Sequence, residues 1–508
     1  MMNDIKIKSA FISVYSKDGL EAIVNKLSEL GVTIVSTGGS YDFITAKGVK
    51  ARKVEEITTY PSILGGRVKT LHPGIFGGIL ARRDNSDDLK QVAEYNITLF
   101  DLVIVDLYPF EETVASGASD QEIIEKIDIG GISLIRAGAK NYADVLIISS
   151  RKQYQPLLEI LDGHKGLVSA SERYRFAIEA FNLTSHYDTA IFMWFNRHND
   201  ITAFKQSIVT GEKLRYGENP HQRGIYFGDL SLVLEHLHGK EISYNNLLDI
   251  EAAIRLIDEF DEATCAIIKH NNACGIASRA DLGAAWEAAL ACDPVSAYGG
   301  VAIVNGHVDE NLATEIDKIF LEIVMAPTFT EKATEILSHK KNRIILLRKY
   351  FKPDDSSFRS LLGGVLWQDR DTAVETAADM KPVTERHPTD EEYQDMIFAN
   401  KVVKHSRSNA IVLARGRQLC ASGIGQTSRV DALRQAIDKA RSFGFSLDGA
   451  VMASDAFFPF ADSVTLAHEA GITAVVQPGG SVRDQESIDY CNKNRVAMVF
   501  TSIRHFKH

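Results

Sequence analysis

The stretch SAFISVYSKDGLEAIVNKLSELGVTIVSTGGS, residues 9–40, decides the fold of the N-terminal part of this chain. It opens with the apolar run Ser9–Val14, which predicts a buried strand, and continues with apolar residues at helical spacing. Asp18 and Glu21 fit the pattern of a capping box, so we expect a helix that begins at Asp18 and ends at Gly31.

The end of this stretch repeats the pattern of its beginning. Val32–Ser36 is the next predicted strand, and the Gly-rich turn Thr37–Ser40 leads into another helix. Two further apolar runs, Leu102–Leu107 and Val145–Ser149, add buried strands to the same sheet. Strand, helix, strand, Gly-rich turn and helix predict a doubly wound, parallel α/β domain.

The length of 508 residues is too great for one hydrophobic core, so we expect more than one domain. An aromatic-rich segment, Arg173–Arg197, predicts a long helix that belongs to the core or to a subunit interface. The polar residues Arg197–Asp200 follow it and mark the predicted boundary. The predicted domains are therefore residues 1–199 and 200–508.

The second part of the chain contains a pattern that occurs twice. Each copy consists of a strand, a Gly-containing turn, a helix and a second strand. The first copy comprises Ala266–Lys269, the turn after it, Asp281–Ala291 and Val301–Asn305. The second copy comprises Ala410–Ala414, Ser422–Gln426, Asp431–Arg441 and Ala450–Ser454. This repetition suggests a duplicated α/β unit.

Composition excludes several classes of protein. The net charge of −11 argues against sequence-independent nucleic-acid binding, which needs a basic surface. The five cysteines include no C-x-x-C pair, and residues 1–19 have neither a signal-peptide nor a transit-peptide pattern, so we expect a cytoplasmic protein. The sequence also lacks an apolar run of the roughly eighteen residues that a transmembrane helix needs, so we expect no membrane association.

Three N-terminal segments combine cations or hydroxyls with glycines. GGRVKTLHPGIFGGI, residues 65–79, carries Arg67, Lys69 and His72, and its glycines predict a loop that forms a site rather than a solvated surface loop. Residues 15–17 and 37–40 each follow a predicted strand and open a helix, where backbone N–H groups suit a phosphate. Neither segment matches the Rossmann or Walker pattern.

The string IIKHNNACG, residues 267–275, places Lys269 and His270 at the end of a buried strand. Ligands of α/β sheets bind at such strand ends, where histidine can accept a proton and an ammonium can stabilise an oxyanion. A core-capping histidine is an equally good interpretation of these residues alone. Local sequence gives no special role to Tyr108, Asp128 or Lys140.

Many strings of the chain, taken in order, resemble one family closely. These are SVYSKDG, STGGS, GGRVKTLHPGIFGGILARR, LYPF, IDIGGISLIRAGAKN, LRYGENPHQ, GKEISYNNLLD, IIKHNNACG, SNAIVLA, GIGQTSR and SDAFFPF. The chain resembles the bifunctional purine-biosynthesis enzymes that join AICAR formyltransferase to IMP cyclohydrolase, and the resemblance covers essentially the whole chain.

The resemblance implies a methylglyoxal-synthase-like N-terminal domain with the cyclohydrolase and a C-terminal transformylase of two cytidine-deaminase-like halves. The formyl group of 10-formyltetrahydrofolate, the co-substrate, would pass to the 5-amine of AICAR. The product, FAICAR, would then lose water and close to IMP. The family forms homodimers, so the resemblance also implies a homodimer.

The resemblance assigns roles to individual residues. His270 would be the base that deprotonates the weakly nucleophilic amine, Lys269 would stabilise the transition state, and Asn409 would position the reacting groups. Lys140 would be the proton donor and acceptor of ring closure, a step that needs proximity and oxyanion support. The residues implied near the closing ring are Lys69, Tyr108, Asp128 and Arg67.

The implied binding residues fall into three groups. IMP and FAICAR would contact Tyr15, Ser16, Lys17, Thr37, Gly38, Gly39, Ser40, Arg67, Val68, Thr70, Asp106 and Ile129. AICAR would contact Arg215, Tyr216, Gly299, Glu322, Arg429 and Arg504. Folate would contact Val430, Phe457, Asp462, Ser481 and Val482.

The chain departs from the family pattern at three positions. Asp106 replaces a common asparagine and adds a negative charge near a phosphate-bearing ligand, Ala273 replaces a common proline, and Tyr298 a common phenylalanine. The deaminase-like halves lack the H-x-E and P-C-x-x-C zinc signature, so we expect no catalytic metal. An alternative is a monofunctional transformylase with an N-terminal nucleotide-binding regulatory module.

Overall fold

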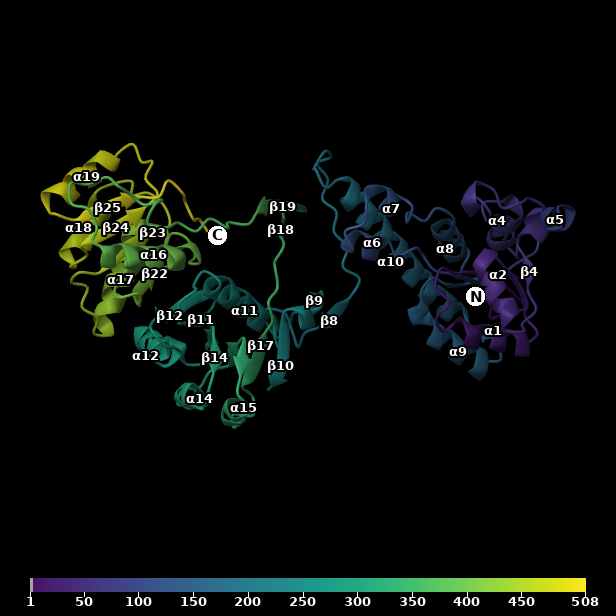
Figure 1. The fold of residues 1–508 in the computed structure, drawn as a ribbon, viewed down its shortest axis with the longest axis horizontal. Helices are drawn as coiled ribbons and strands as arrows, with labels where there is room; N and C mark the ends of the chain where they lie inside the picture. Colours follow the sequence, from purple (N-terminus) through teal and green to yellow (C-terminus); the bar gives the residue numbers. More distant parts are fainter. Residues whose placement is uncertain (1–2) are drawn as a thin grey trace. The chain divides into compact units, whose positions relative to one another are not determined.

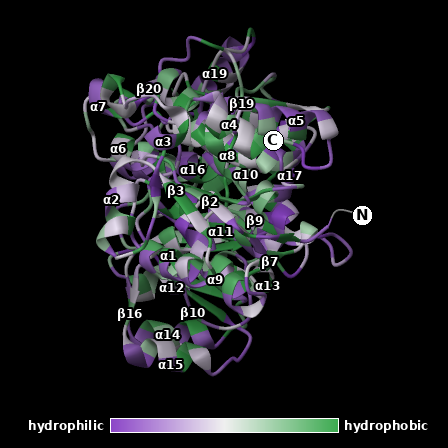
Figure 2. Cartoon of the chain, turned by 90° about the vertical axis from the view of Figure 1, so that its right-hand side faces the viewer, coloured by the Kyte–Doolittle hydropathy of each residue, from purple (hydrophilic) through white to green (hydrophobic). Residues whose placement is uncertain are grey.

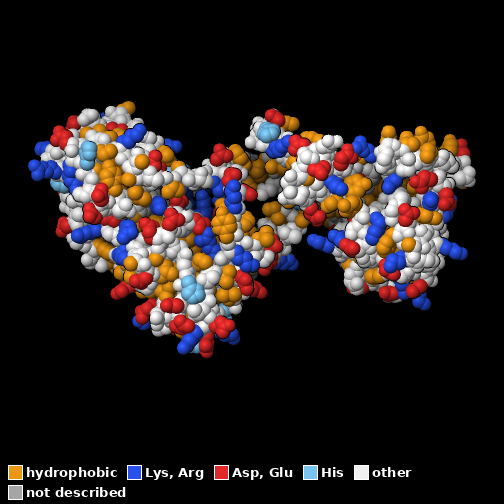
Figure 3. All heavy atoms as spheres, viewed as in Figure 1, with side chains coloured by type: hydrophobic (Ala, Val, Ile, Leu, Met, Phe, Trp, Pro, Cys, Tyr) orange, Lys and Arg blue, Asp and Glu red, His pale blue; other side chains and the backbone are white. Residues whose placement is uncertain are grey.

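The computed structural model describes residues 3–508, which form two compact units. Unit 1 extends to Val209 and unit 2 comprises Thr210–His508 (Figure 1). The division falls ten residues after the boundary expected from the sequence. Acidic and basic side chains are interspersed over the visible face of each unit (Figure 3).

Unit 1 alternates short strands and helices. Its strands are β1 (Ile5–Lys6), β2 (Ser9–Ser13), β3 (Thr33–Ser36), β4 (Arg52–Lys53), β5 (Leu102–Val105), β6 (Leu146–Ile148) and β7 (Leu167–Val168). Its helices are α1 (Leu20–Glu29), α2 (Gly38–Ala46), α3 (Glu55–Thr58), α4 (Pro73–Leu80), α5 (Ser86–Glu94), α6 (Phe110–Ala115), α7 (Asp120–Ile124), α8 (Gly130–Lys140), α9 (Tyr154–Gly163) and α10 (Ala170–Phe195).

The main sheet of unit 1 is parallel, with the strand order β4-β3-β2-β5-β6. Within this sheet the chain enters at the central strand β2 and adds β3 and β4 on one side of it. It then adds β5 and β6 on the other side of β2. This confirms the doubly wound parallel sheet. The order reverses between β2 and β5, so the carboxyl ends of these strands border the crevice where such folds bind ligands.

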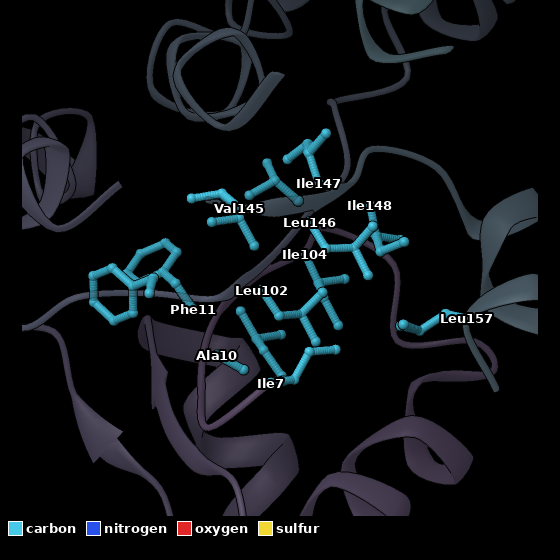
Figure 4. Close-up of a cluster of buried hydrophobic side chains, with 14 of the residues drawn as sticks. Ile7, Ala10, Phe11, Leu102, Ile104, Val145, Leu146, Ile147, Ile148 and Leu157 are labelled. Carbon is cyan, nitrogen blue, oxygen red and sulfur yellow. The ribbon is translucent and has the colours of Figure 1, made fainter. Parts of the chain in front are cut away.

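The core of unit 1 lies on this sheet because its inner strands are continuous apolar runs. Phe11, Leu102, Ile104 and Leu146 are fully buried and belong to one cluster of apolar side chains (Figure 4). Hydrophobic residues accordingly concentrate in interior strands such as β2 (Figure 2). The long helix α10, predicted as Arg173–Arg197, is confirmed and begins with a capping box at Ser169.

Two local predictions in unit 1 are wrong. The helix α1 begins at Leu20 after Gly19, which has a φ of 76°, and Asp18 instead accepts hydrogen bonds from Ser16 and Arg151. The predicted loop 65–79 becomes the helix α4 from Pro73 onward. Gly78 is needed within this helix because the helix packs closely here. A Cβ at this position would lie 2.0 Å from the Thr98 carbonyl oxygen.

The first half of unit 2 contains β8 to β17 and α11 to α15. Its strands are β8 (Gly211–Lys213), β9 (Ile225–Phe227), β10 (Leu234–His238), β11 (Thr264–Lys269), β12 (Asn272–Ser278), β13 (Val301–Val304), β14 (His307–Val308), β15 (Ile323–Ala326), β16 (Thr328–Phe329) and β17 (Ile344–Arg348). Its helices are α11 (Tyr244–Ile257), α12 (Leu282–Cys292), α13 (Pro294–Ala297), α14 (Glu310–Asp317) and α15 (Glu331–Ser338).

A hairpin of β18 (Ser356–Leu361) and β19 (Gly364–Asp369) leads to the second half. The strands of that half are β20 (Lys381–Pro382), β21 (Ile411–Ala414), β22 (Leu419–Gly423), β23 (Val451–Ser454), β24 (Ala474–Gln477) and β25 (Ala497–Phe500). Its helices are α16 (Asp390–Lys404), α17 (Arg429–Ser442), α18 (Asp462–Glu469) and α19 (Asp484–Lys493).

The two halves of unit 2 repeat one topology, which confirms the duplication. The six-stranded sheets have the orders β10-β17-β15-β13-β11-β12 and β20-β25-β24-β23-β21-β22. The segments predicted as turns in both copies belong in part to the edge strands β12 and β22, and a bridge between Ala277 and Gln418 joins these edges. Within residues 3–508, no helix combines the length and the apolarity that a membrane crossing needs.

Candidate active sites

A cavity of about 730 Å³ opens in unit 1 at the carboxyl ends of β2 and β5, where the strand order reverses. The predicted residues that line it are Tyr15, Lys17, Thr37, Gly39, Ser40, Arg67, Lys69, Thr70, Asp106, Tyr108, Asp128 and Ile129. Three other predicted binding residues, Ser16, Gly38 and Val68, are neighbours of lining residues in the sequence. Among the described residues, they are not part of the cavity wall. The fold thus brings together residues that are more than a hundred positions apart.

One wall of the cavity suits an anion. The helix α2 begins here after Thr37, so its first backbone N–H groups and the positive end of its dipole face the cavity. The hydroxyl of Ser40 bonds to Val14 N at 3.0 Å and fixes the turn after β2. A Cβ at Gly38 would lie 3.4 Å from the Lys69 ammonium, which places that cation beside the turn.

Asp106 brings a negative charge to the same wall. Its carboxylate accepts hydrogen bonds from the backbone N–H groups of Tyr15 and of Ser16, the latter at 3.0 Å. Burial raises the pKa of Asp106, against the effect of these hydrogen bonds and of Lys17. Burial likewise lowers the pKa of Lys17, although Asp106 opposes this shift.

Asp128 and Tyr108 form a second wall with titratable groups. Asp128 accepts a hydrogen bond of 2.6 Å from Gly131 N at the start of α8, and burial raises its pKa. Burial and the neighbouring Asp128 also raise the pKa of Tyr108. Both groups therefore hold their protons more tightly than exposed side chains do, which suits proton exchange with a ligand.

Two aromatic rings, those of Tyr15 and Tyr108, also line the unit 1 cavity. Tyr15 and Tyr108 pack edge to face with ring centroids 5.4 Å apart. The Lys126 ammonium lies 5.5 Å and 5.9 Å from the centroids of these rings. Sequence reasoning missed Lys126 because it belongs to no string with a local signature.

Two residues of the predicted N-terminal site lie elsewhere. Lys140 is exposed at the last position of α8, whose first residue, Gly130, lines the cavity. Ten residues of α-helix separate the two ends by about 15 Å. His72 caps α4 by accepting a hydrogen bond of 3.0 Å from Gly74 N, so it stabilises a helix and does not line the cavity.

In unit 2, Lys269 ends β11 and His270 begins the turn to β12. His270 and Asn271 adopt positive φ angles of 51° and 65°, and Asp249 holds the turn by accepting Asn271 N at 2.7 Å. The Lys269 ammonium donates to the Tyr298 carbonyl oxygen at 2.5 Å. His270 is exposed, so the alternative of a core-capping histidine is wrong.

The predicted AICAR residues of the first half lie near this turn. Gly299 follows Tyr298 and donates its N–H to the Phe320 carbonyl oxygen at 2.7 Å. Burial works against the ionisation of Glu322, but hydrogen bonds from Lys240 and Asn246 outweigh it and lower its pKa.

The guanidinium of Arg215 stacks on the Tyr216 ring, 4.7 Å from its centroid, and donates to its hydroxyl at 2.9 Å. Arg215 also contributes electrostatically to the low pKa of Glu322. Arg215, Tyr216 and Glu322 therefore form one set of neighbouring residues on the first half of unit 2.

The second half of unit 2 holds another set of neighbouring residues, which surrounds Arg429. This side chain donates to Asp455 at 2.7 Å and to the Asn409 side-chain oxygen at 3.0 Å. It also reaches the Phe457 carbonyl oxygen at 3.3 Å. Asp455 is fully buried, so the ion pair fixes Arg429 and Asn409 relative to each other.

The other predicted residues of this half lie at element ends and loops. Val430 is in the first turn of α17, and Asp462 begins α18. Ser481 and the fully exposed Val482 lie in the loop before α19, and Arg504 stacks on Phe506 in the C-terminal segment. The predicted AICAR residues are thus divided between the two halves, whereas the predicted folate residues all lie in the second half.

A smaller cavity of about 320 Å³ lies at the seam between the halves. Lys269 and His270 line it together with Ser422 and Lys439 of the second half. Sequence reasoning missed Lys439, which pairs with Asp293 at 2.7 Å across the seam. Among residues 3–508, no group of three or more His, Cys, Asp or Glu side chains could hold a metal ion.

Comparisons with known proteins agree with this arrangement. The profile of the AICARFT/IMPCHase bienzyme family matches residues 138–439, and that of the MGS-like domain matches residues 19–133. A bifunctional purine biosynthesis protein PurH from Bacteroides thetaiotaomicron is 60% identical over the full length of both chains. PurH proteins from Acetivibrio thermocellus and Aquifex aeolicus are each 46% identical, covering 99% and 98% of this chain and all of their own.

Proposed function

We propose a division of labour between the two units of this chain, which belongs to the AICARFT/IMPCHase bienzyme family. Members of this family are bifunctional, and this enzyme transfers a formyl group from 10-formyltetrahydrofolate to AICAR and closes the product, FAICAR, to IMP. In our proposal, ring closure takes place in unit 1 and formyl transfer in unit 2. The alternative of a regulatory N-terminal module is not supported by the bifunctional relatives.

The observation that carries the assignment of ring closure is the cavity with Lys69, Tyr108 and Asp128 on its walls. The phosphate would bind at the start of α2, and the imidazole ring would lie against Tyr15 and Tyr108. The carboxamide nitrogen then attacks the formyl carbon, and Lys69 supports the oxyanion that forms. Tyr108 and Asp128 would exchange the protons that leave with the departing water.

The lone pair of the 5-amine of AICAR is delocalised into the imidazole ring, so this amine is a weak nucleophile. Formyl transfer therefore needs a base. In our proposal, His270 takes a proton from this amine as its nitrogen attacks the formyl carbon. The Lys269 ammonium stabilises the oxygen anion of the tetrahedral intermediate. Collapse of the intermediate breaks the bond from the formyl carbon to N10, which takes up the proton held by His270, and tetrahydrofolate is released.

The division of predicted residues between two sets supports a homodimer. Lys269, His270 and Glu322 belong to the first half, whereas Asn409 and Arg429 belong to the second. We propose that the first-half set of one chain completes a site with the second-half set of its partner. We also propose that the enzyme is cytoplasmic, because its five cysteines are all free thiols.

Product analysis tests the two activities. Enzyme given AICAR and 10-formyltetrahydrofolate should make FAICAR and then IMP, and enzyme given FAICAR alone should make IMP. Failure to consume the formyl donor would refute formyl transfer, and failure to convert FAICAR would refute ring closure. Lys140→Ala tests the role implied for Lys140, because accumulated FAICAR would assign that residue to ring closure in spite of its position.

A further inference from the structure

His505 lies in the C-terminal segment, residues 501–508, and is only 2% exposed. Its Nδ1 lies 2.7 Å from a carboxylate oxygen of Asp371, and its Nε2 lies 2.8 Å from one of Glu375. A neutral imidazole can donate a hydrogen bond from only one ring nitrogen, whereas an imidazolium donates from both. Two carboxylate acceptors at these distances therefore hold His505 in its charged form.

We propose that His505 is a positioning residue for formyl transfer, because its imidazolium fixes the C-terminal segment, which carries Arg504, beside Asn409. This inference rests on the proposed roles of Asn409 and Arg504 in unit 2. His505 itself is buried, so it acts through the segment that it anchors and does not touch substrate.

Backbone contacts carry the position of His505 to the site. His505 N donates to the Asp455 carbonyl oxygen at 3.0 Å, and Asp455 also binds Arg429. Two residues further, Lys507 and Ser408 exchange hydrogen bonds of 2.9 Å and 3.0 Å. The segment is thus tied to Ser408, which directly precedes Asn409, and to Asp455, which binds Arg429. Arg504 directly precedes the anchored imidazolium.

Charged groups from the segment before β20 and from α16 face this cluster. Burial alone would lower the pKa of His505, but the hydrogen bonds to Asp371 and Glu375 outweigh it and raise the pKa to about 9. The second oxygen of Glu375 accepts a hydrogen bond of 2.8 Å from Asn400 of α16. Lys404 of the same helix acts electrostatically on Asp371.

Lys507 is the other titratable group of the segment. Burial, Arg255 and Arg407 lower its pKa to about 8. Its amine donates to the His405 carbonyl oxygen at 2.9 Å, a bond that a neutral amine can keep. Loss of the Lys507 proton as the pH rises through about 8 therefore leaves this hydrogen bond in place, whereas the charge of His505 is lost as the pH rises through about 9.

The test uses the full-length enzyme and measures kcat and KM of both reactions between pH 7 and pH 10. We expect His505→Gln to raise the KM for AICAR about tenfold at pH 7.5 and to lower kcat, because a neutral amide carries no positive charge and has its N–H donors on one atom only. Closure of added FAICAR in unit 1 should be unchanged, which controls for enzyme quality. His307→Gln, which changes an exposed histidine bonded to Thr328, should leave both reactions unchanged.

A second variant keeps the test valid if His505→Gln does not fold. Glu375→Gln removes one negative partner and should lower the pKa of His505, so the alkaline loss of formyl transfer should move to lower pH by about one unit. Lys507 is present in both enzymes, so the difference between the profiles reports His505. Wild-type KM and kcat in His505→Gln, or coincident profiles for Glu375→Gln, would overturn the inference. Wild-type enzyme that makes no FAICAR would instead overturn the proposed function.

Discussion

The two units of this chain build their sites in different ways. In unit 1, one parallel sheet collects nearly all predicted residues around a single cavity at the carboxyl ends of β2 and β5. In unit 2, two sheets of the same order each carry part of the predicted site. The difference follows from topology, because a doubly wound sheet has one crevice at its switch point, whereas a duplicated sheet has two equivalent edges.

This contrast has a consequence for assembly. A unit that holds its complete site can act within one chain, while a unit with a divided site depends on how copies associate. Unit 1 should therefore tolerate changes at the C-terminal sites, and unit 2 should be sensitive to the pairing of chains.

The largest expected effect separates the two units directly. His270→Ala should reduce formyl transfer at least about a hundredfold, because the AICAR amine loses its base, while FAICAR closure in unit 1 continues. The measurement is FAICAR formed from AICAR, with IMP formed from added FAICAR as the control. Loss of both activities in a folded variant would contradict two independent sites.

Mixing two inactive variants tests the divided site. His270→Ala changes the first-half set and Asn409→Ala the second-half set. In a homodimer with shared sites, half of the randomly paired dimers are hybrids, and each hybrid has one intact site. Co-refolding equal amounts should restore about a quarter of wild-type formyl transfer. No recovery in samples shown to contain hybrids would place both residues in the same site of one chain.

The sheets of the two units could be predicted from the sequence better than the details of either site. The central strands of both units were predictable because each is a continuous apolar run such as Leu102–Val105, which only a sheet covered on both faces accommodates. Parts of the edge strands β12 and β22 fall in segments predicted as turns, because both strands contain glycine and polar residues.

Side-chain roles were less predictable because they depend on tertiary neighbours. Asp18 fits a capping pattern, yet it bonds to Arg151, which is distant in the sequence. His72 looked like a ligand-binding group among glycines and is a helix cap. Lys126 has no local signature and becomes visible only when Tyr15 and Tyr108 are brought together.

A smaller effect concerns the charge balance of the unit 1 cavity. Burial raises the pKa of Asp106, so its carboxylate gains a negative charge as the pH rises through that raised value. This charge opposes a phosphate at the start of α2. Asp106→Asn should therefore bind IMP about fivefold more tightly at pH 8, which corresponds to about 1 kcal/mol, and the gain should shrink at lower pH.

Isothermal titration with IMP at several pH values gives the measurement. Asp18→Asn is the matched control, because Asp18 is an exposed carboxylate on the loop that Asp106 holds through Tyr15 and Ser16, and its replacement should leave affinity nearly unchanged. Equal or weaker IMP binding by Asp106→Asn at pH 8 would show that the hydrogen bonds of Asp106 to Tyr15 and Ser16 matter more than its charge.

The smallest expected effect distinguishes a helix cap from a ligand in unit 1. His72→Ala removes the acceptor of Gly74 N at the start of α4 and should lower the free energy of unfolding of unit 1 by about 1 kcal/mol. The KM for FAICAR should stay at its wild-type value, because His72 does not line the cavity. His72→Ser, which restores a capping oxygen, should recover most of the stability measured by thermal unfolding. A raised KM in both variants, with unchanged stability, would return His72 to the site and would extend the unit 1 cavity beyond the crevice between β2 and β5.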